Sequence, residues 1–348
     1  MENYPIHGKI DRRLSLDHGD YLYFSGTAYL GMGSLPEFEK LIIQGIQKYG
    51  PNHGASRFSN VQLQVYEELE RHFAAEAGAS EAALLSSGYL AASLAMRMVR
   101  RLADELWVAP DAHPAILPLK KETVPYDTFE NYIEFCIRRS QQVEGQTIGI
   151  ISNAVDTILP SIHTFDWINQ LSPHNDYYLL IDDSHAFGLL GRGIYGTYSQ
   201  WKNLPAEVVV AGSLGKALAI PAGIILSKHH FIDKIKKSSL FRGASPPLPG
   251  YCEAFMSAEH LYQRQLGKLK DNLTYFLQKL PKKDHIRYDP TFPVITFKKS
   301  GWAEKLAQKG ILISSFAYPH PQDPVTDRII ISAYHHKADL DKLIAAMH

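Results

Sequence analysis

The sequence predicts an α/β protein with a large domain, in which helices flank a mainly parallel sheet, and a smaller C-terminal α/β domain. Three observations indicate this fold. Short apolar runs alternate with helical patterns along most of the chain, as in a doubly wound sheet. Several of these runs are apolar almost without interruption, which is typical of strands covered on both faces. The 348 residues are also enough for one large and one smaller domain.

The first part of the chain predicts an arm followed by two helices. Residues 1–40 are rich in Gly, Tyr and Asp and contain one short apolar run, YLYF at 21–24, so we expect an arm that lies on the rest of the molecule. A helical pattern begins at Pro36 and stops at the polar, Gly-containing loop 50–60. The apolar spacing then predicts a second helix from about Val61 to Ala77.

Residues 41–262 are expected to form the large domain and residues 263–348 the small one. In the large domain, strands are predicted at 82–86, 105–109, 147–152, 178–181 and 208–212, with helices at 90–103, 129–141 and 165–171. A long helical pattern leads from Pro247 towards Leu280. The small domain continues with strands at 294–297, 311–315 and 328–332 and helices at 302–309 and 338–347.

Charge and composition exclude several kinds of partner. Lys plus Arg and Asp plus Glu both number 36, without a long run of one sign, so we expect no nucleic-acid partner. No apolar run approaches transmembrane length, and the N-terminal segment MENYPIHGKIDRR carries charges where a signal peptide would be apolar, so we expect no membrane partner. Cys136 and Cys252 lack metal-binding or redox spacing, which suits a reducing cytoplasm.

Lys216 is the residue on which the functional prediction depends. It lies between two apolar runs in VVVAGSLGKALAIPAGIILS (208–227), and burial lowers the pKa of an amine. The neutral amine is the form that makes a Schiff base. For this lysine alone, a solvated surface position is the alternative. A P-loop is excluded because only two residues separate Gly212 from Gly215-Lys216 and no hydroxyl residue follows.

Polar residues follow the predicted strands at their carboxyl ends, where open parallel sheets bind ligands. Each has a simpler alternative: His113 could cap a helix, Gly88 could form a turn, and Asp182 with Asp183 could bind a metal, although companion ligands are not evident. We therefore expect no metal site, and the set as a whole favours one shared ligand. Its members are Ser87, Gly88, Tyr89, Asp111, His113, Ser152, Asn153, Asp182, Asp183, Ser184, His185, Ser213 and Lys216.

These residues suit pyridoxal 5'-phosphate, which needs a lysine, an acid at its pyridine nitrogen, a phosphate site and a flat packing partner. Two blocks resemble the α-oxoamine synthases: IDDSHAFGLLGRGIYG (181–196) and GSLGKALAIPAG (212–223). Weaker similarities to the same family are YFSGTAYLGM (23–32), HGASRFSN (53–60), LLSSGYLAA (84–92) and PDAHPAI (110–116). The resemblance extends over nearly the whole chain and implies a fold-type-I pyridoxal-phosphate-dependent transferase.

The resemblance implies a role for each catalytic candidate. Lys216 would bind the cofactor as a Schiff base and, once released, act as the general base. Asp182 would pair with the protonated pyridine nitrogen, and His185 would bond the phenolic oxygen of the ring. His113 would stack on the ring face.

Further contacts to cofactor and substrate are implied as well. The phosphate would accept from backbone N–H groups of Gly88 and Tyr89, after Ser87, at a helix N-terminus, and Ser213 would add a hydroxyl. Asn153, at the place of a family glutamate, is expected beside the cofactor. Arg328 would hold the substrate carboxylate with its planar fork, the alternative being an arginine that faces water.

The departures from the family pattern lie around the substrate. Besides Asn153, Thr27 and Ala28 replace an asparagine and an acid, and Phe241–Pro247 has lost hydroxyl residues. The family implies condensation of an amino acid with an acyl thioester of CoA or an acyl carrier protein to give an aminoketone, by a homodimer with sites at the subunit interface. An aminotransferase is the alternative, and a non-enzymatic cofactor-binding protein is a third possibility.

Overall fold

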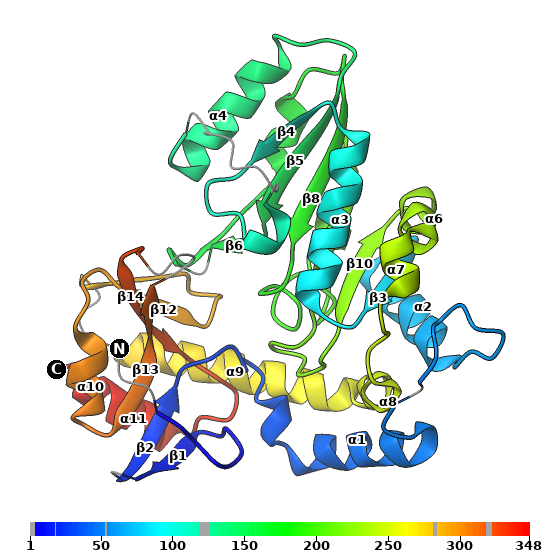
Figure 1. The fold of residues 1–348 in the computed structure, drawn as a ribbon. Coiled ribbons are helices and arrows are strands. Elements are labelled where there is room, and N and C mark those ends of the chain that lie inside the picture. Colours follow the sequence, from blue (N-terminus) through cyan, green and yellow to red (C-terminus); the bar gives the residue numbers. More distant parts are fainter. Residues whose placement is uncertain are drawn as a thin grey trace.

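The protein is described as a computed structural model for residues 4–17, 19–52, 54–117, 126–156, 158–280, 284–317 and 322–348. Of the motifs above, His53 lies outside the described residues. Two six-stranded sheets form the molecule, one from the middle of the chain and one from its two ends (Figure 1). In the described part of the chain, no helix combines the length and apolar character needed to cross a membrane.

The large sheet has the strand order β3-β10-β9-β8-β5-β4. Its strands β4, β5, β8 and β9 are parallel, and β10 runs antiparallel to both of its neighbours, β9 and β3. The prediction of a mainly parallel sheet is therefore confirmed. The bounds are β3 Glu81–Leu85, β4 Glu105–Val108, β5 Thr147–Asn153, β8 Asp176–Asp182, β9 Glu207–Ser213 and β10 Gly223–Ser227.

Helices cover both faces of this sheet, which explains the uninterrupted apolar runs. Ile150 in β5 packs into one core cluster and its neighbour Ile151 into the other, because successive side chains of a strand point to opposite faces. The second cluster is closed by α3 and α6, and α2 and α4 pack on the first. These helices are α2 Val65–Ala77, α3 Gly88–Leu102, α4 Phe129–Ser140 and α6 His229–Lys237, with the short α5 Tyr198–Trp201 and α7 Ser239–Gly243.

Three predicted helices differ from the observed ones. The helix expected from Val61 begins at Val65, since the side chain of Val61 is 66% exposed and contributes nothing to the buried face. The segment 165–171 forms only a 3-10 helix, η3 (Asp166–Gln170), because Pro173 follows too soon for an α-helix to continue. The long pattern after Pro247 divides into α8 (Pro249–Ser257) and α9 (Glu259–Lys279) at Ala258.

The second sheet combines both ends of the chain, in the order β1-β2-β13-β14-β12-β11. The N-terminal strand β2 runs parallel to β13 and buries Leu22 and Phe24. In Figure 1, α9 runs from below the large sheet across to the second sheet and so joins the two regions. The bounds are β1 Arg13–Leu16, β2 Gly19–Phe24, β11 Ile286–Tyr288, β12 Val294–Phe297, β13 Ile311–Ala317, β14 Val325–Ile330, α1 Pro36–Tyr49, α10 Trp302–Ala307 and α11 Lys337–Ala346, with η1 Met32–Ser34 and η2 Pro114–Ile116.

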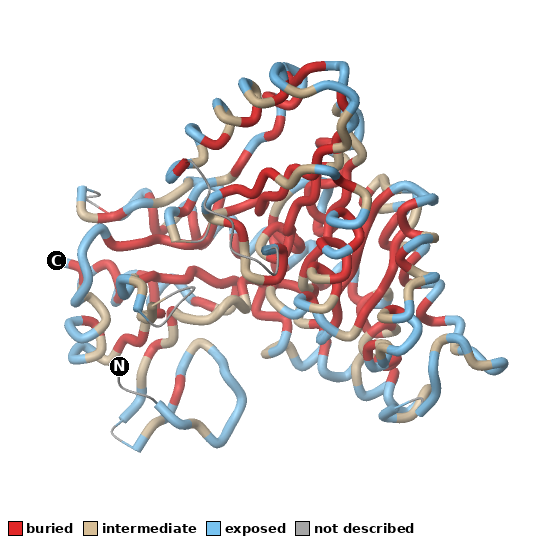
Figure 2. Tube along the Cα trace, turned by 45° about the horizontal axis from the view of Figure 1, so that its top comes forward, coloured by how far each residue is buried: buried red, intermediate tan, exposed pale blue. Residues whose placement is uncertain are grey.

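Figure 2 shows buried residues along the strands of both sheets and exposed ones on the surrounding loops and helices. Strands β5 and β8 point their carboxyl ends towards the second sheet (Figure 1). A small hairpin of β6 (Val155–Asp156) and β7 (Ser161–Ile162) follows β5 directly. The ends of the large sheet, this hairpin and β14 of the second sheet enclose the candidate site.

Candidate active site

A cavity of about 610 Å³ lies where the two sheets meet. Its walls come from the loops after β4, β8 and β9, from the β6–β7 hairpin, from the start of α4 and from β13 and β14. The convergence expected of the strand ends is therefore present, and Arg328 approaches from the second sheet. The lining residues include seven that the sequence singled out: Asp111, His113, Asn153, Asp182, His185, Lys216 and Arg328.

Lys216 follows β9 in a tight loop. Leu214 and Ala222 are bonded through backbone N–H and C=O groups, and Ala219 has a φ of 55°, a left-handed conformation that non-glycine residues rarely adopt. Burial lowers the pKa of Lys216 to about 8, and the negative charge of Asp182 opposes this shift. Near pH 8 a large fraction of this amine is therefore the neutral nucleophile.

Asp182 is the last residue of β8, and its two carboxylate oxygens differ. One accepts a hydrogen bond from the backbone, and the other accepts none from the described residues. Oδ1 accepts the backbone N–H of Ser184 at 2.8 Å. Oδ2 is buried and has no hydrogen-bond partner among the described residues, and it lies 3.8 Å from His113 Nδ1. A buried carboxylate oxygen without a donor is costly, and the protonated ring nitrogen of pyridoxal phosphate would supply one. The residues present thus fit this cofactor.

The neighbouring Asp183 has a different environment and is part of the core. Its Oδ2 accepts the backbone N–H of Thr197 at 2.6 Å, and its Oδ1 accepts the Thr197 hydroxyl at 2.8 Å. Burial raises its pKa to about 7. Asp183 therefore anchors the loop that follows β8, and its oxygens are occupied, so the arrangement does not favour a metal bound by the pair.

Two histidines face the cavity as neutral imidazoles. His113 Nδ1 accepts the backbone N–H of Ala115 at 3.1 Å, so the cap considered from the sequence exists, and burial lowers the pKa of this ring. His185 Nδ1 lies 2.8 Å from the hydroxyl of Tyr29, and burial lowers the pKa of His185 well below its ordinary value. The sequence placed Tyr29 in the YFSGTAYLGM segment without assigning it a role.

The predicted phosphate site lies at the start of α3, beside the cavity. Ser87 caps the helix by accepting the N–H of Leu90 at 3.2 Å. Gly88 packs on Ser213 so closely that a Cβ at Gly88 would lie 2.3 Å from Ser213 Cβ, which only glycine allows. Tyr89 is 62% exposed. The structure thus brings Ser87, Gly88 and Ser213 together, and none of these side chains is among those that line the cavity.

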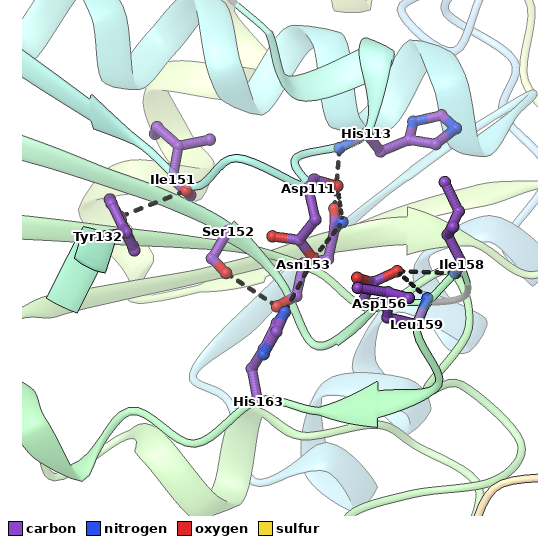
Figure 3. Close-up of polar contacts among 10 residues, drawn as sticks. All are labelled: Asp111, His113, Tyr132, Ile151, Ser152, Asn153, Asp156, Ile158, Leu159 and His163. Carbon is purple, nitrogen blue, oxygen red and sulfur yellow. Dashed lines mark hydrogen bonds and ion pairs between the residues drawn. The ribbon is translucent and has the colours of Figure 1, made fainter. Parts of the chain in front are cut away.

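A polar network after β5 connects His113 to the rest of the wall (Figure 3). Asn153 Oδ1 accepts the backbone N–H of His113 at 3.0 Å, and its Nδ2 donates to the carbonyl of Asp111 at 2.5 Å. The predicted Asn153 therefore holds the His113 loop through the backbone. Asp111 Oδ2 lies 2.8 Å from His163 Nε2.

Sequence reasoning missed most of this outer wall. His163 is 7% exposed, stacks on Phe129 with ring centroids 3.6 Å apart, and directly follows β7. Asp156 Oδ1 accepts the backbone N–H groups of Ile158 and Leu159, and burial, reinforced by the charge of Asp111, raises its pKa. Hairpin residues of this kind lie between, rather than at the ends of, the predicted strands, so the strand-end signal could not include them.

Arg328 lies in β14 across the cavity from these residues. It is 9% exposed, and its guanidinium carbon lies 4.6 Å from the centre of the Phe316 ring. A buried guanidinium held by an aromatic ring is well placed to bind an anion. The solvent-facing alternative considered for this arginine is therefore wrong.

A family model for aminotransferase class I and II matches residues 12–347. The chain belongs to this family. The predictions of an enzyme, of a transferase and of pyridoxal phosphate as cofactor are thereby confirmed.

Individual relatives agree with the resemblance to α-oxoamine synthases. An 8-amino-7-oxononanoate synthase from Petrotoga mobilis is 28% identical over 90% of this chain and 84% of its own length. One from Nitrosomonas eutropha is 24% identical over 99% and 93%. A serine palmitoyltransferase from S. paucimobilis, solved with a bound PLP–myriocin aldimine, superposes with a TM-score of 0.82 at 16% identity over 99% and 91% of the two chains. The predicted family resemblance and fold class are confirmed.

Proposed function

We propose that this protein joins an amino acid to an acyl thioester and releases an aminoketone, as an enzyme of the 8-amino-7-oxononanoate synthase type. The observation that carries the proposal is Lys216, a half-buried amine with a lowered pKa, in one cavity with the available oxygen of Asp182 and the guanidinium of Arg328. The curated relatives that bear this name support it. The reaction would form a C–C bond between the amino-acid Cα and the thioester carbonyl carbon, with loss of a proton or carbon dioxide from Cα and release of the thiol.

Pyridoxal phosphate, when bound, supplies an aldehyde that condenses with amines and a ring that withdraws electrons from the substrate Cα. Lys216 would bind the aldehyde and, after the amino acid displaces it, accept a proton at Nζ. Asp182 would keep the ring nitrogen protonated through its available Oδ2. His113 would cover one face of the ring, His185 would contact the phenolic oxygen, and the start of α3 with Ser213 would hold the phosphate.

Arg328 is the group best suited to the substrate carboxylate. It is buried, it lies in the second sheet opposite the cofactor residues, and its planar fork matches a carboxylate. Asn153 would act on the substrate side only indirectly, through the His113 loop, because its amide is bonded to Asp111 and to the His113 backbone.

Thiol release tests the proposal. Cofactor-loaded protein is mixed with each acyl-CoA or acyl carrier protein thioester, with and without each amino acid, and free thiol is measured. Release that depends on both substrates, with an aminoketone found by mass spectrometry, is expected. Thioester hydrolysis that is independent of every amino acid would contradict it.

A second candidate is an aminotransferase, which the name of the matching family model favours. In this reaction Lys216 would return the proton to the cofactor, and Cα would not react with a thioester. An aminotransferase would convert bound cofactor to pyridoxamine phosphate with an amino acid alone. Retention of the aldehyde form under those conditions would exclude it.

We further propose a homodimer in the cytoplasm. Large apolar side chains are exposed in the loop before α2 (Phe58 and Val61), at the start of α3 (Tyr89) and just before α8 (Leu248). A second subunit would cover them. Sedimentation at several concentrations tests this, and two inactive variants that restore activity when mixed would show that subunits share their sites.

A further inference from the structure

We propose that Tyr29 is a positioning residue that fixes the tautomer of His185, so that Nε2 carries the imidazole proton and presents it to the cavity. The tautomer itself follows from the protein's own contacts. Its use, donation of a hydrogen bond to the phenolic oxygen of the cofactor, rests on the proposed function.

The contact between the two side chains is short and enclosed. Tyr29 Oη lies 2.8 Å from His185 Nδ1, and Tyr29 is 1% exposed. The phenol ring also packs against Phe292, with centroids 5.9 Å apart. The phenol side of this hydrogen bond is therefore shielded from water, and the direction of the bond matters energetically.

Both groups are neutral, which leaves two possible directions. Burial raises the pKa of the Tyr29 phenol, and burial together with the positive charges of Lys216 and Arg328 lowers the pKa of His185. Either the phenol donates to an unprotonated Nδ1, or a protonated Nδ1 donates to the phenol oxygen.

The second direction would leave the phenol proton without an acceptor. Among the residues that the structure describes, Tyr29 Oη has no hydrogen-bond partner other than His185. A buried hydroxyl proton without an acceptor is costly, so the phenol donates and Nδ1 accepts. The imidazole proton then resides on Nε2.

A second tyrosine–histidine pair shows the opposite arrangement. Tyr195 Oη lies 3.0 Å from His72 Nε2, but it also lies 2.6 Å from Glu259 Oε2. The carboxylate accepts the hydrogen bond that the phenol donates, so His72 Nε2 must donate to the phenol oxygen. The presence or absence of a second acceptor therefore decides the direction, and this pair provides a matched control.

The backbone of Tyr29 is held independently of His185. Its carbonyl accepts the N–H of Ala333 at 2.9 Å and the hydroxyl of Ser332 at 3.0 Å, and the next carbonyl, of Leu30, accepts Gln265 Nε2 at 2.9 Å. These partners come from the segment after β14 and from α9, whereas His185 belongs to the loop after β8. The segment after β14 and α9 thus hold the Tyr29 hydroxyl in place, and this hydroxyl orients the side chain of His185.

The tautomer can be measured by NMR on cofactor-free protein with ¹⁵N-labelled histidine, using His185→Gln to assign the signal. For the wild type we expect a proton on Nε2 and an acceptor shift at Nδ1. Tyr29→Phe should give a mixture of both tautomers, and Tyr195→Phe should leave the His185 signals unchanged. A wild-type His185 with its proton on Nδ1, or a Tyr29→Phe spectrum identical to wild type, would overturn the proposal. The wild-type spectrum decides even if Tyr29→Phe does not fold.

The second readout is the cofactor-loaded protein. In Tyr29→Phe, part of the His185 population should lose its Nε2–H donor. The pH at which the visible absorption of the lysine-bound cofactor changes should then rise by about one pH unit. Tyr195→Phe should not shift it. If the protein binds no pyridoxal phosphate, the proposed function fails while the NMR result still decides the tautomer. If it binds and the titration does not move, the role assigned to Tyr29 is wrong.

Discussion

The two halves of the cavity are built differently. In the half proposed to bind the cofactor, called the cofactor half, Asp182 ends β8, and His185 and Lys216 lie on the loops that leave β8 and β9. In the half proposed to face the substrate, called the substrate half, Asp111, Asp156 and His163 are joined by contacts between a loop and a hairpin. The parallel sheet positions the residues of the first half, whereas those of the second are positioned by pairings such as Asp111–His163, which are 52 positions apart in the sequence. Under the proposed function, we therefore expect changes of Asp156 or His163 to affect the substrate more than the cofactor.

The largest effect is expected in the cofactor half. Lys216→Ala removes both the amine that binds the aldehyde and the base, so activity should fall at least about 10³-fold. The visible absorption of the lysine-bound cofactor should disappear while far-UV circular dichroism stays unchanged. Substantial activity in this variant would show that the comparison assigns the wrong residue to this half.

Asp182→Asn should be the next most damaging change. An amide cannot hold a protonated ring nitrogen as a carboxylate does, so we expect turnover to fall by about 100-fold or more with cofactor still bound. Steady-state kinetics and equilibrium dialysis separate the two quantities. Asp183→Asn is a matched control for the position: because Asp183 anchors Thr197, it should lower the melting temperature rather than remove the chemistry selectively.

Lys216 should also make the stability of the cofactor-free protein depend on pH. Its pKa is about 8 in the folded state and near 10.5 when unfolded. Between these values the unfolded state binds more protons, so wild-type stability rises with pH through this window. Lys216→Met should therefore stabilise the protein by on the order of 3 kcal/mol below pH 8, and the gain should vanish above pH 10.5. Urea denaturation at several pH values measures this difference, and a gain that is independent of pH would contradict a lowered lysine pKa.

Changes in the substrate half should be smaller and of another kind. Asp111→Asn or His163→Asn breaks a contact of 2.8 Å in the wall, and we expect kcat/KM to fall about tenfold with an unaltered cofactor spectrum. The loss of activation free energy in the double variant should be smaller than the sum of the losses in the two single variants, since the two residues act as a pair. His230→Asn is the control, because it breaks an exposed His230–Glu207 pair away from the cavity. A changed cofactor spectrum in Asp111→Asn would mean that the two halves are not independent.

The sequence predicted most of the fold and several of the residues that gather around the cavity. Runs such as TIGIIS (147–152) carry their strand signal locally, because helices cover both faces and nearly every side chain is apolar or small. Asp182 and Lys216 could be found for the same reason, since Asp182 ends one such run and Lys216 lies three residues after the end of another.

Features that depend on distant partners could not be predicted in this way. The pairing of β2 with β13 joins residues almost 300 positions apart, and nothing within YLYF indicates its partner. Tyr29 was found only as part of a motif, because its role depends on a histidine 156 positions away. The late start of α2 is similar, since the exposure of Val61 depends on the folded surroundings.

The central claim is that Lys216 carries the cofactor in this cavity, and reductive trapping tests it most directly. Protein loaded with pyridoxal phosphate is treated with borohydride, digested and mapped by tandem mass spectrometry. The account predicts one dominant modified peptide, with the pyridoxyl group on Lys216, and loss of that peptide when an amino-acid substrate is added first. Modification spread over surface lysines, with Lys216 unmodified, would contradict it.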